Sequence, residues 1–244
     1  MVVYLVGVVH MDPLGPRRLT TLFNALQPTD IALERDEKSS IRGAALFAQA
    51  VSRNATRRRE TIRHIGRYMF GDTEYIHTQD LRHFSQWFFR TAGFESRYAE
   101  RFARRTGARI HAIDDPGPQT PSALEQLALQ AVVYLDCPVW QWTRDGALRN
   151  SADLYDDCAS LLVDLPLKTR VELDHRDTVM AANLRSIAKE STTPVCVVGL
   201  GHTHGYRDNL YDRLADLNPV RIRLCDADSP HAPRMLQSML SRHA

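Results

Sequence analysis

Two histidines stand three residues after a glycine, and each follows an apolar run. The first pair is Gly7-x-x-His10 in "VGVVHMD", and the second is Gly199-x-x-His202 in "VVGLGHTHG", which also holds His204. Imidazole nitrogens bind divalent metals and serve as acids and bases. A glycine at this position lets the backbone turn sharply, so that a side chain three residues later faces the crevice beyond the strand. The repeated spacing marks both histidines as candidate functional residues.

Carboxylates follow two further apolar runs. Glu34 ends "DIALE", and Asp114 and Asp115 end "HAIDD". In an open parallel sheet, the residues that follow the carboxyl ends of the strands converge at one edge, even when they are far apart in the chain. Two or three imidazoles together with carboxylates form a ligand set that suits Zn²⁺ or Mn²⁺. Each residue taken alone also fits an ordinary turn or an ion pair with an arginine.

A phosphate-binding loop is an alternative interpretation of the second histidine segment. Three glycines give G-x-G-x-x-x-G between an expected strand and an expected helix: Gly199, Gly201 and Gly205. The helix is expected to begin near Tyr206, and Asp226 ends the next strand, where a ribose-binding acid would sit. Two bulky imidazoles occupy the middle of this loop, and the motif falls in the last strand–helix unit instead of the first. Nucleotide binding is therefore the less favoured alternative.

Short β-rich runs alternate with helical segments along the chain. The expected strands are Val2–Val9, Ile31–Leu33, Arg109–Ile113, Pro194–Val198 and Val220–Cys225. Continuous valine, isoleucine and leucine are typical of strands buried on both faces of a parallel sheet. We therefore expect an α/β fold, a mainly parallel sheet flanked by helices, in a single domain over residues 1–244.

Helical spacing separates the expected strands. Four apolar residues at i, i+3, i+4 and i+7 predict a helix behind the first strand: Leu19, Leu22, Phe23 and Leu26. Pro28 ends this helix, and Thr120 followed by Pro121 predicts the start of another.

Residues 40–106 contain no convincing strand and predict a helical insertion after the second strand. Its aromatic stripes, which include Trp87 and Phe88, are expected to enter the core or to overhang the site as a lid or clamp, and Gly107 ends its last helix. The basic run at 53–67 is expected to form a solvated helix face, because no aromatic side chains interleave its arginines.

Composition narrows the classes of function. The 244 residues carry a net charge of +2, which gives no reason to expect nucleic acid or an anionic membrane as a partner. The cysteines show no C-x-x-C spacing and are expected to be reduced and structural. The opening "MVVYLVGVVH" lacks the basic start of a leader peptide and is too short to span a bilayer. We therefore expect a soluble, cytoplasmic protein, and the sequence does not indicate its oligomeric state.

Four blocks of the chain resemble the TraB/Tiki family, part of a broader group with erythromycin-esterase-like and ChaN-like proteins. In order they are "VYLVGVVHMDP…PTDIALERD", "GARIHAIDDPGPQT", "HRDTVMAANL" and "VCVVGLGHTHGYRDNL". They lie within residues 3–36 and 107–214, and the two Gly-x-x-His elements are their most specific part. The resemblance implies an α/β core with two related halves and the activity of a metal-dependent protease.

The positions that match the family are His10, Glu34, Arg176, Asp177 and His202. By this resemblance, His10, Glu34 and His202 hold a divalent cation, Mn²⁺, Co²⁺ or Zn²⁺. The cation would acidify a water and polarise the scissile carbonyl of a peptide or of a small ester or amide. Arg176 would stabilise the oxyanion. Asp177, or one of the two aspartates behind the third strand, would orient or deprotonate the water.

The chain departs from the family pattern at two places. It has His175 where the family usually has a glutamate, and Asp115 where the family has an arginine. These departures leave open a second function, a non-catalytic peptide-binding or regulatory module of the kind associated with shutting down a peptide pheromone. His204 either completes the ligand set or faces solvent, and we favour the second. Because His10 and His202 follow strands, we expect that replacing either with alanine leaves the fold intact.

Overall fold

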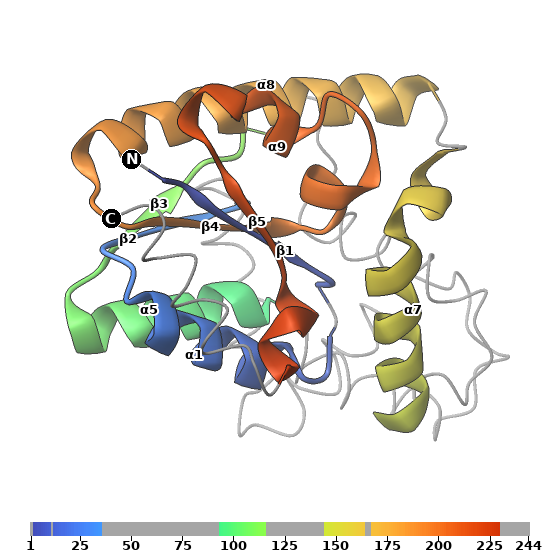
Figure 1. Ribbon diagram of the computed structural model, residues 1–244, viewed down its shortest axis with the longest axis horizontal. Coiled ribbons are helices and arrows are strands. Elements are labelled where there is room, and N and C mark those ends of the chain that lie inside the picture. The colour runs from blue at the N-terminus through green and yellow to red at the C-terminus, as the bar shows by residue number, and fades with distance from the viewer. Residues whose placement is uncertain (1, 11, 36–92, 116–143, 164–166, 230–244) are drawn as a thin grey trace, which may run out of the picture.

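The computed structural model describes residues 2–10, 12–35, 93–115, 144–163 and 167–229. Within them, five parallel strands form one sheet in the order β3-β2-β4-β1-β5 (Figure 1). The strands are β1 (Tyr4–Val8), β2 (Asp30–Leu33), β3 (Arg109–Ala112), β4 (Pro194–Gly199) and β5 (Val220–Arg223). Each overlaps a run that the sequence predicts, so the expected α/β fold with a parallel sheet is confirmed.

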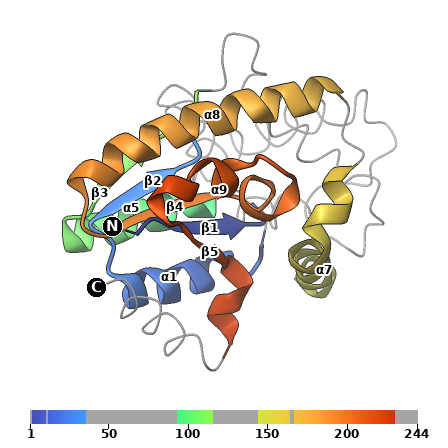
Figure 2. The ribbon, with the colours of Figure 1, turned by 45° about the horizontal axis from the view of Figure 1, so that its top comes forward.

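Helices cover both faces of the sheet (Figure 1, Figure 2). On one face lie α1 (Gly15–Leu26) and α5 (Phe94–Thr106), and on the other lie α8 (Leu167–Glu190) and the short α9 (Leu210–Arg213). Helix α7 (Arg144–Val163) stands beyond the carboxyl ends of the strands in both views. The described residues also form three short turns. The π-helical turn η2 (Gly201–Gly205) follows β4, the 3₁₀ turn η3 (Ala215–Leu217) follows α9, and the 3₁₀ turn η4 (Leu224–Asp228) follows β5.

The central strands β1 and β4 are apolar on both faces of the sheet because both faces are covered. Every residue of β1 and β4 is buried. Val6 of β1 belongs to one apolar cluster with Phe23 of α1 and Phe102 of α5. Its neighbour Leu5 points to the other face and belongs to a second cluster with Met180 of α8. This alternation follows from the two-residue period of a pleated strand.

Helix α1 shows how local sequence sets the elements that surround the site. Pro16 occupies its first turn, where a missing backbone N–H costs nothing. The predicted apolar residues are all buried: Leu19, Leu22, Phe23 and Leu26. The helix ends at Leu26. The next residue, Gln27, adopts a left-handed conformation with a φ of 47°, and Pro28 follows it. The predicted end of this helix is therefore confirmed.

The connections that leave β1 and β4 run in opposite directions. The chain continues from β1 through α1 toward β2, but from β4 through η2 and α9 toward β5 on the other side. Because β1 and β4 are neighbours, their exit segments separate at the carboxyl edge of the sheet (Figure 2). Open α/β sheets bind ligands at such a switch point.

The described end of the predicted insertion forms α5. Its side chains Phe94, Ala99 and Phe102 belong to the core. Helix α5 therefore packs on a face of the sheet instead of overhanging the site as a lid, and only its first turn reaches the carboxyl edge. The helix ends at Gly107, which has a φ of 80°, as predicted.

Several expectations concern residues outside the described ranges, namely those for 53–67, for Trp87 and Phe88, and for a helix that starts at Thr120. Within the described ranges, Cys158, Cys196 and Cys225 are free thiols. No helix in this part of the chain is long and apolar enough to cross a membrane.

Candidate active site

Glu34 lies at the centre of a polar cluster at the carboxyl edge of the sheet. It follows β2, and its Oε1 accepts a hydrogen bond from Arg176 Nη2 at 2.6 Å and lies 3.3 Å from His202 Nε2. Its Oε2 accepts the Gly199 N–H at 2.5 Å and lies 3.8 Å from His10 Nε2. Burial raises the pKa of Glu34, but the positive charges of His202 and Arg176 outweigh burial and hold this pKa well below its ordinary value. Glu34 is therefore ionised.

His202 enters the cluster from η2, directly after β4. Its Nδ1 lies 2.6 Å from Asp177 Oδ1, and Nδ1 carries the proton because a carboxylate only accepts. Asp177 is fully buried in α8, and the Tyr206 hydroxyl donates to its other oxygen. Burial lowers the pKa of His202, but the charge of Glu34 and the bond to Asp177 outweigh burial and raise this pKa to about 9. The ring is therefore fixed in orientation and is protonated at neutral pH.

His10 reaches the same carboxylate from the segment after β1. Its Nδ1 lies 3.0 Å from Oε1 of Glu95, which belongs to the first turn of α5. Burial lowers the pKa of His10, but the bond to Glu95 and the charge of Glu34 outweigh burial and raise this pKa above its ordinary value. The side chain of His10 is 36% exposed, whereas that of His202 is 6% exposed. His10 is therefore the imidazole that a ligand can reach.

The two imidazoles share one arrangement. Each binds a buried carboxylate through Nδ1 and presents Nε2 to Glu34. A carboxylate on one ring nitrogen fixes the tautomer and the direction of the ring, which is how metal-binding histidines are usually held. The structure thus brings together three of the residues that the sequence marks, from the ends of β1, β2 and β4.

Gly199 leaves room at the point where the three side chains meet. A Cβ atom at Gly199 would lie 2.9 Å from His10 Nε2 and 3.2 Å from Glu34 Oε2. A Cβ atom at Gly7 would collide with Thr203 Oγ1. Both glycines are strand residues, and neither has a positive φ. The prediction of a sharp backbone turn at these glycines is therefore wrong. Glycine is needed at both positions because a larger side chain would collide with neighbouring groups.

Arg176 links Glu34 to a second carboxylate. Its guanidinium binds Asp114 through both Nε and Nη2, with the Nη2 bond at 2.6 Å. Burial raises the pKa of Asp114 above its ordinary value, despite the opposing bond and charge of Arg176. Asp114 thus positions Arg176, as Asp177 positions His202, and both carboxylates already have partners within the cluster. Asp115 is exposed next to it.

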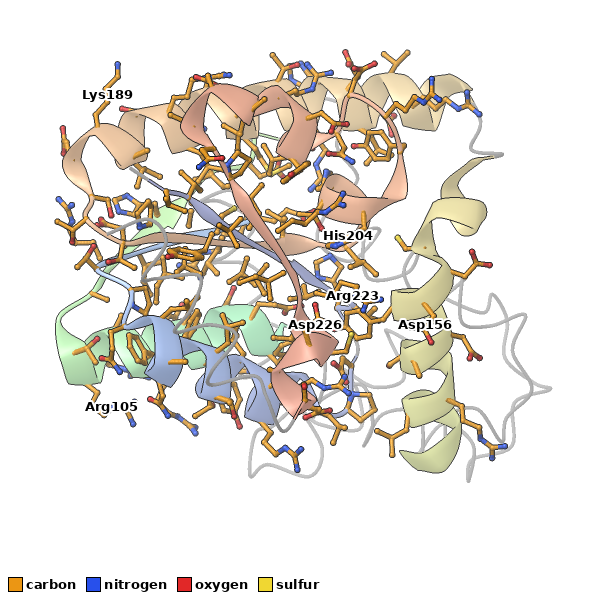
Figure 3. All side chains as sticks on the ribbon, in the orientation of Figure 1. Arg105, Asp156, Lys189, His204, Arg223 and Asp226 are labelled. Carbon is orange, nitrogen blue, oxygen red and sulfur yellow. The ribbon has the colours of Figure 1, made fainter. Side chains whose placement is uncertain are left out.

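His204 faces a different part of the carboxyl edge. Its Nδ1 lies 2.7 Å from Thr203 Oγ1, and its ring lies toward Arg223 at the end of β5 (Figure 3). Burial, followed by the charges of Arg221 and Arg223, lowers the pKa of His204 to about 4, so the ring is neutral. His175, which stands where the family has a glutamate, is exposed on α8.

The segment after β4 has little in common with a phosphate cradle. Residues Gly201–Gly205 form a π-helical turn in which His202 and Thr203 are buried. Asp226, the expected ribose-binding acid, accepts the backbone N–H of Arg223 and also binds its guanidinium. The geometry therefore favours the histidine interpretation over nucleotide binding.

Sequence reasoning did not identify Glu95 or Tyr206, although both bind groups of the cluster. A signal for Glu95 exists, because a helix that connects two parallel strands runs antiparallel to them. The first turn of such a helix lies at the carboxyl edge, and Glu95 is the acidic residue of that turn. Tyr206 gave no comparable signal, since its bond to Asp177 depends on how η2 packs against α8.

Within the described ranges, no three His, Cys, Asp or Glu side chains are arranged as a ready metal site. Glu34 instead pairs with Arg176 and His202, so its charge is balanced by groups of the chain itself. Comparison of the chain with family models, with curated proteins and with solved structures found no match. The resemblance to the TraB/Tiki family therefore stays a prediction that rests on four blocks of sequence.

Proposed function

We propose that the chain is a metal-dependent hydrolase of peptide bonds, or of similar amide or ester bonds, with its centre at His10, Glu34 and His202. One observation supports this proposal above the others. Two imidazoles from different connections of the sheet are each held by a carboxylate at Nδ1 and directed at one ionised carboxylate. This is the orientation that proteins give to histidines that bind metals.

The donor set suits a divalent transition metal such as Zn²⁺, Co²⁺ or Mn²⁺, because it offers two imidazole nitrogens and a carboxylate. Ligands that bind a tetrahedral ion at about 2.0–2.2 Å lie roughly 3.4 Å from one another. Glu34 Oε1 lies 3.3 Å from His202 Nε2, which is close to this spacing, and Glu34 Oε2 lies 3.8 Å from His10 Nε2, which is longer. To bind an ion, His202 would give up the Nε2 proton that now faces Glu34.

The groups around this set have distinct roles in the proposed reaction. A bound ion would supply an acidified water and would polarise the scissile carbonyl. Arg176 is held beside Glu34 by Asp114, and its permanent charge would stabilise negative charge on the substrate oxygen. The exposed side of His10 marks where the substrate enters, since His202 and Asp177 are buried.

Metal binding by a single-site variant tests this proposal. His10→Ala is expected to weaken Co²⁺ binding by at least about tenfold in isothermal titration calorimetry, because a ligand is lost. The same variant should abolish hydrolysis of any peptide or ester that the wild type cleaves with metal added. His204→Ala is the matched control, since it removes a histidine from the same edge that faces Thr203 instead of Glu34. Equal Co²⁺ affinity in His10→Ala and the wild type would refute the metal centre.

A peptide-binding module without turnover is the second candidate function. It is favoured by the pairing within the cluster, because Glu34, Asp114 and Asp177 each have a donor or cation as a partner without any ion. This candidate predicts that a peptide library yields binders whose affinity is independent of added Co²⁺ and which stay uncut in mass spectra. Cleavage that requires added metal would exclude it.

A further inference from the structure

Helix α7 contacts the segment that carries His10 through one buried side chain. The Tyr155 hydroxyl accepts the Val9 N–H at 3.1 Å and donates to Asp12 Oδ2 at 3.1 Å. Val9 and Asp12 stand on either side of His10 in the chain. Helix α7 itself comes from beyond the carboxyl ends of the strands (Figure 1). One phenol thus holds both ends of the short segment that presents His10.

Asp12 is a firm anchor for this phenol. It is fully buried, and its carboxylate accepts the Leu14 N–H at 2.8 Å and pairs with Arg18 at 2.6 Å. Arg18 pairs in turn with Asp228 of η4. The Asp12 backbone N–H also donates to the Val9 carbonyl at 2.9 Å. These bonds fix Asp12 from several directions. The phenol that donates to Asp12 is therefore also fixed, and it holds the Val9 N–H in place.

The Val9 N–H depends on this phenol. Val9 follows the last residue of β1, where the hydrogen-bond ladder of the strand ends, and it is buried. A buried backbone N–H without an acceptor is unfavourable, so loss of the hydroxyl would favour movement of the segment toward water. Such movement would carry His10, whose partly exposed ring is otherwise held by its bond to Glu95.

We propose that Tyr155 is a positioning residue, which directs the imidazole of His10 toward Glu34 by holding Val9 and Asp12 on either side of it. This assignment extends the proposed function, since positioning matters for the reaction only where His10 works in it. Burial of Tyr155 supports the role, because burial and the charge of Asp12 raise the pKa of the phenol and keep its proton available for the carboxylate. Helix α7 is thereby part of the site, although none of its described side chains pairs with Glu34.

Nuclear magnetic resonance of Tyr155→Phe tests the assignment without metal or turnover. The variant keeps the ring in the core and removes only the hydroxyl. We expect hydrogen exchange of the Val9 amide to accelerate by at least about tenfold. We also expect the hydrogen-bonded Nδ1–H resonance of His10 to broaden or disappear, while that of His202, held by Asp177, stays as in the wild type. Tyr211→Phe, which removes a hydroxyl from α9, is the matched control and should change neither signal.

A His10 Nδ1–H resonance in Tyr155→Phe that is unchanged from the wild type would overturn the assignment, because a purely structural tyrosine would lower stability alone. Asp12→Asn provides a second variant, since it weakens the same contact and should affect the His10 resonance in the same direction. Co²⁺ affinity adds an independent arm, with an expected loss of about tenfold in Tyr155→Phe. A wild type that binds no Co²⁺ would refute the proposed metal function, whereas the resonance experiment would still decide the role of Tyr155.

Discussion

The two histidines that face Glu34 stand in unequal surroundings. His202 is buried, and its ring is enclosed between Glu34 and the fully buried Asp177. His10 has the same pairing with Glu95, but about a third of its side chain is exposed. The comparison indicates that the same kind of pairing, between a carboxylate and imidazole Nδ1, serves two purposes. On the His202 side it contributes to the stability of the fold, and on the His10 side it orients a group that a ligand can reach.

The largest expected difference between the two sides concerns their carboxylates. Asp177→Ala leaves the buried, charged His202 and the Tyr206 hydroxyl without their partner, so the free energy of unfolding should fall by about 3–5 kcal/mol. Glu95→Ala should cost about 1 kcal/mol, because water can replace its bond to the exposed His10. Urea unfolding followed by circular dichroism measures both values. Equal losses of unfolding free energy in Asp177→Ala and Glu95→Ala would contradict the difference between the surroundings of His202 and those of His10.

The pH dependence of stability should separate the same two histidines. The pKa of His202 is raised from 6.5 to about 9, mainly by Glu34 and Asp177 acting against burial. A raised pKa stabilises the fold fully below pH 6.5, and this contribution is lost as the pH rises through about 9. The free energy of unfolding of the metal-free protein should therefore fall by about 3 kcal/mol across this window.

His202→Gln provides the control for this pH dependence, because it removes the titrating group and should remove most of the fall. His10→Gln should retain most of it, since the exposed ring is more weakly coupled to the fold. Urea titrations at a series of pH values in the presence of a chelator give the comparison. A wild-type stability that stays constant across this window would contradict the account of His202.

A smaller effect is expected from filling the space between the histidines. Gly199→Ala places a Cβ atom 2.9 Å from His10 Nε2, and we expect a cost of about 1–3 kcal/mol together with weaker Co²⁺ binding. Gly7→Ala is the matched substitution in β1, where the added atom meets Thr203 and leaves Glu34 untouched. It should destabilise to a similar degree but retain Co²⁺ affinity. Calorimetric titration of both variants with Co²⁺ distinguishes a loss of space at the metal site from a general disturbance of packing.

The elements were predictable because β1 and β4 are apolar runs, the other three strands carry isoleucine within short β-rich runs, and α1 has regular apolar spacing. The ends of those strands also placed His10, Glu34 and His202 at one edge, since parallel strands share their direction. The burial of His202 was not predictable from its place after a strand. Because it binds two buried carboxylates, the expectation that His202→Ala leaves the fold intact is not supported by its surroundings.

The partners of the cluster were harder to predict than its members. Asp177 was expected to act on water, but it is fully buried and holds His202 instead. Glu95 and Tyr155 reach the site only because α5 and α7 pack as they do around the strands. The position of Glu95 at the carboxyl edge follows from its place in the first turn of α5. Its contact with His10, and that of Tyr155 with Val9, depend on the relative placement of whole helices, which a local sequence pattern does not specify.

Diffraction from crystals grown with Co²⁺ would decide whether these residues hold a metal. We expect one peak in the anomalous difference map, about 2.0–2.2 Å from His10 Nε2, from His202 Nε2 and from an oxygen of Glu34. His202 Nδ1 should remain on Asp177, and His10 Nδ1 on Glu95, as they are without an ion. A map with no peak between the two imidazoles, with His202 Nε2 still paired with Glu34, would contradict the account.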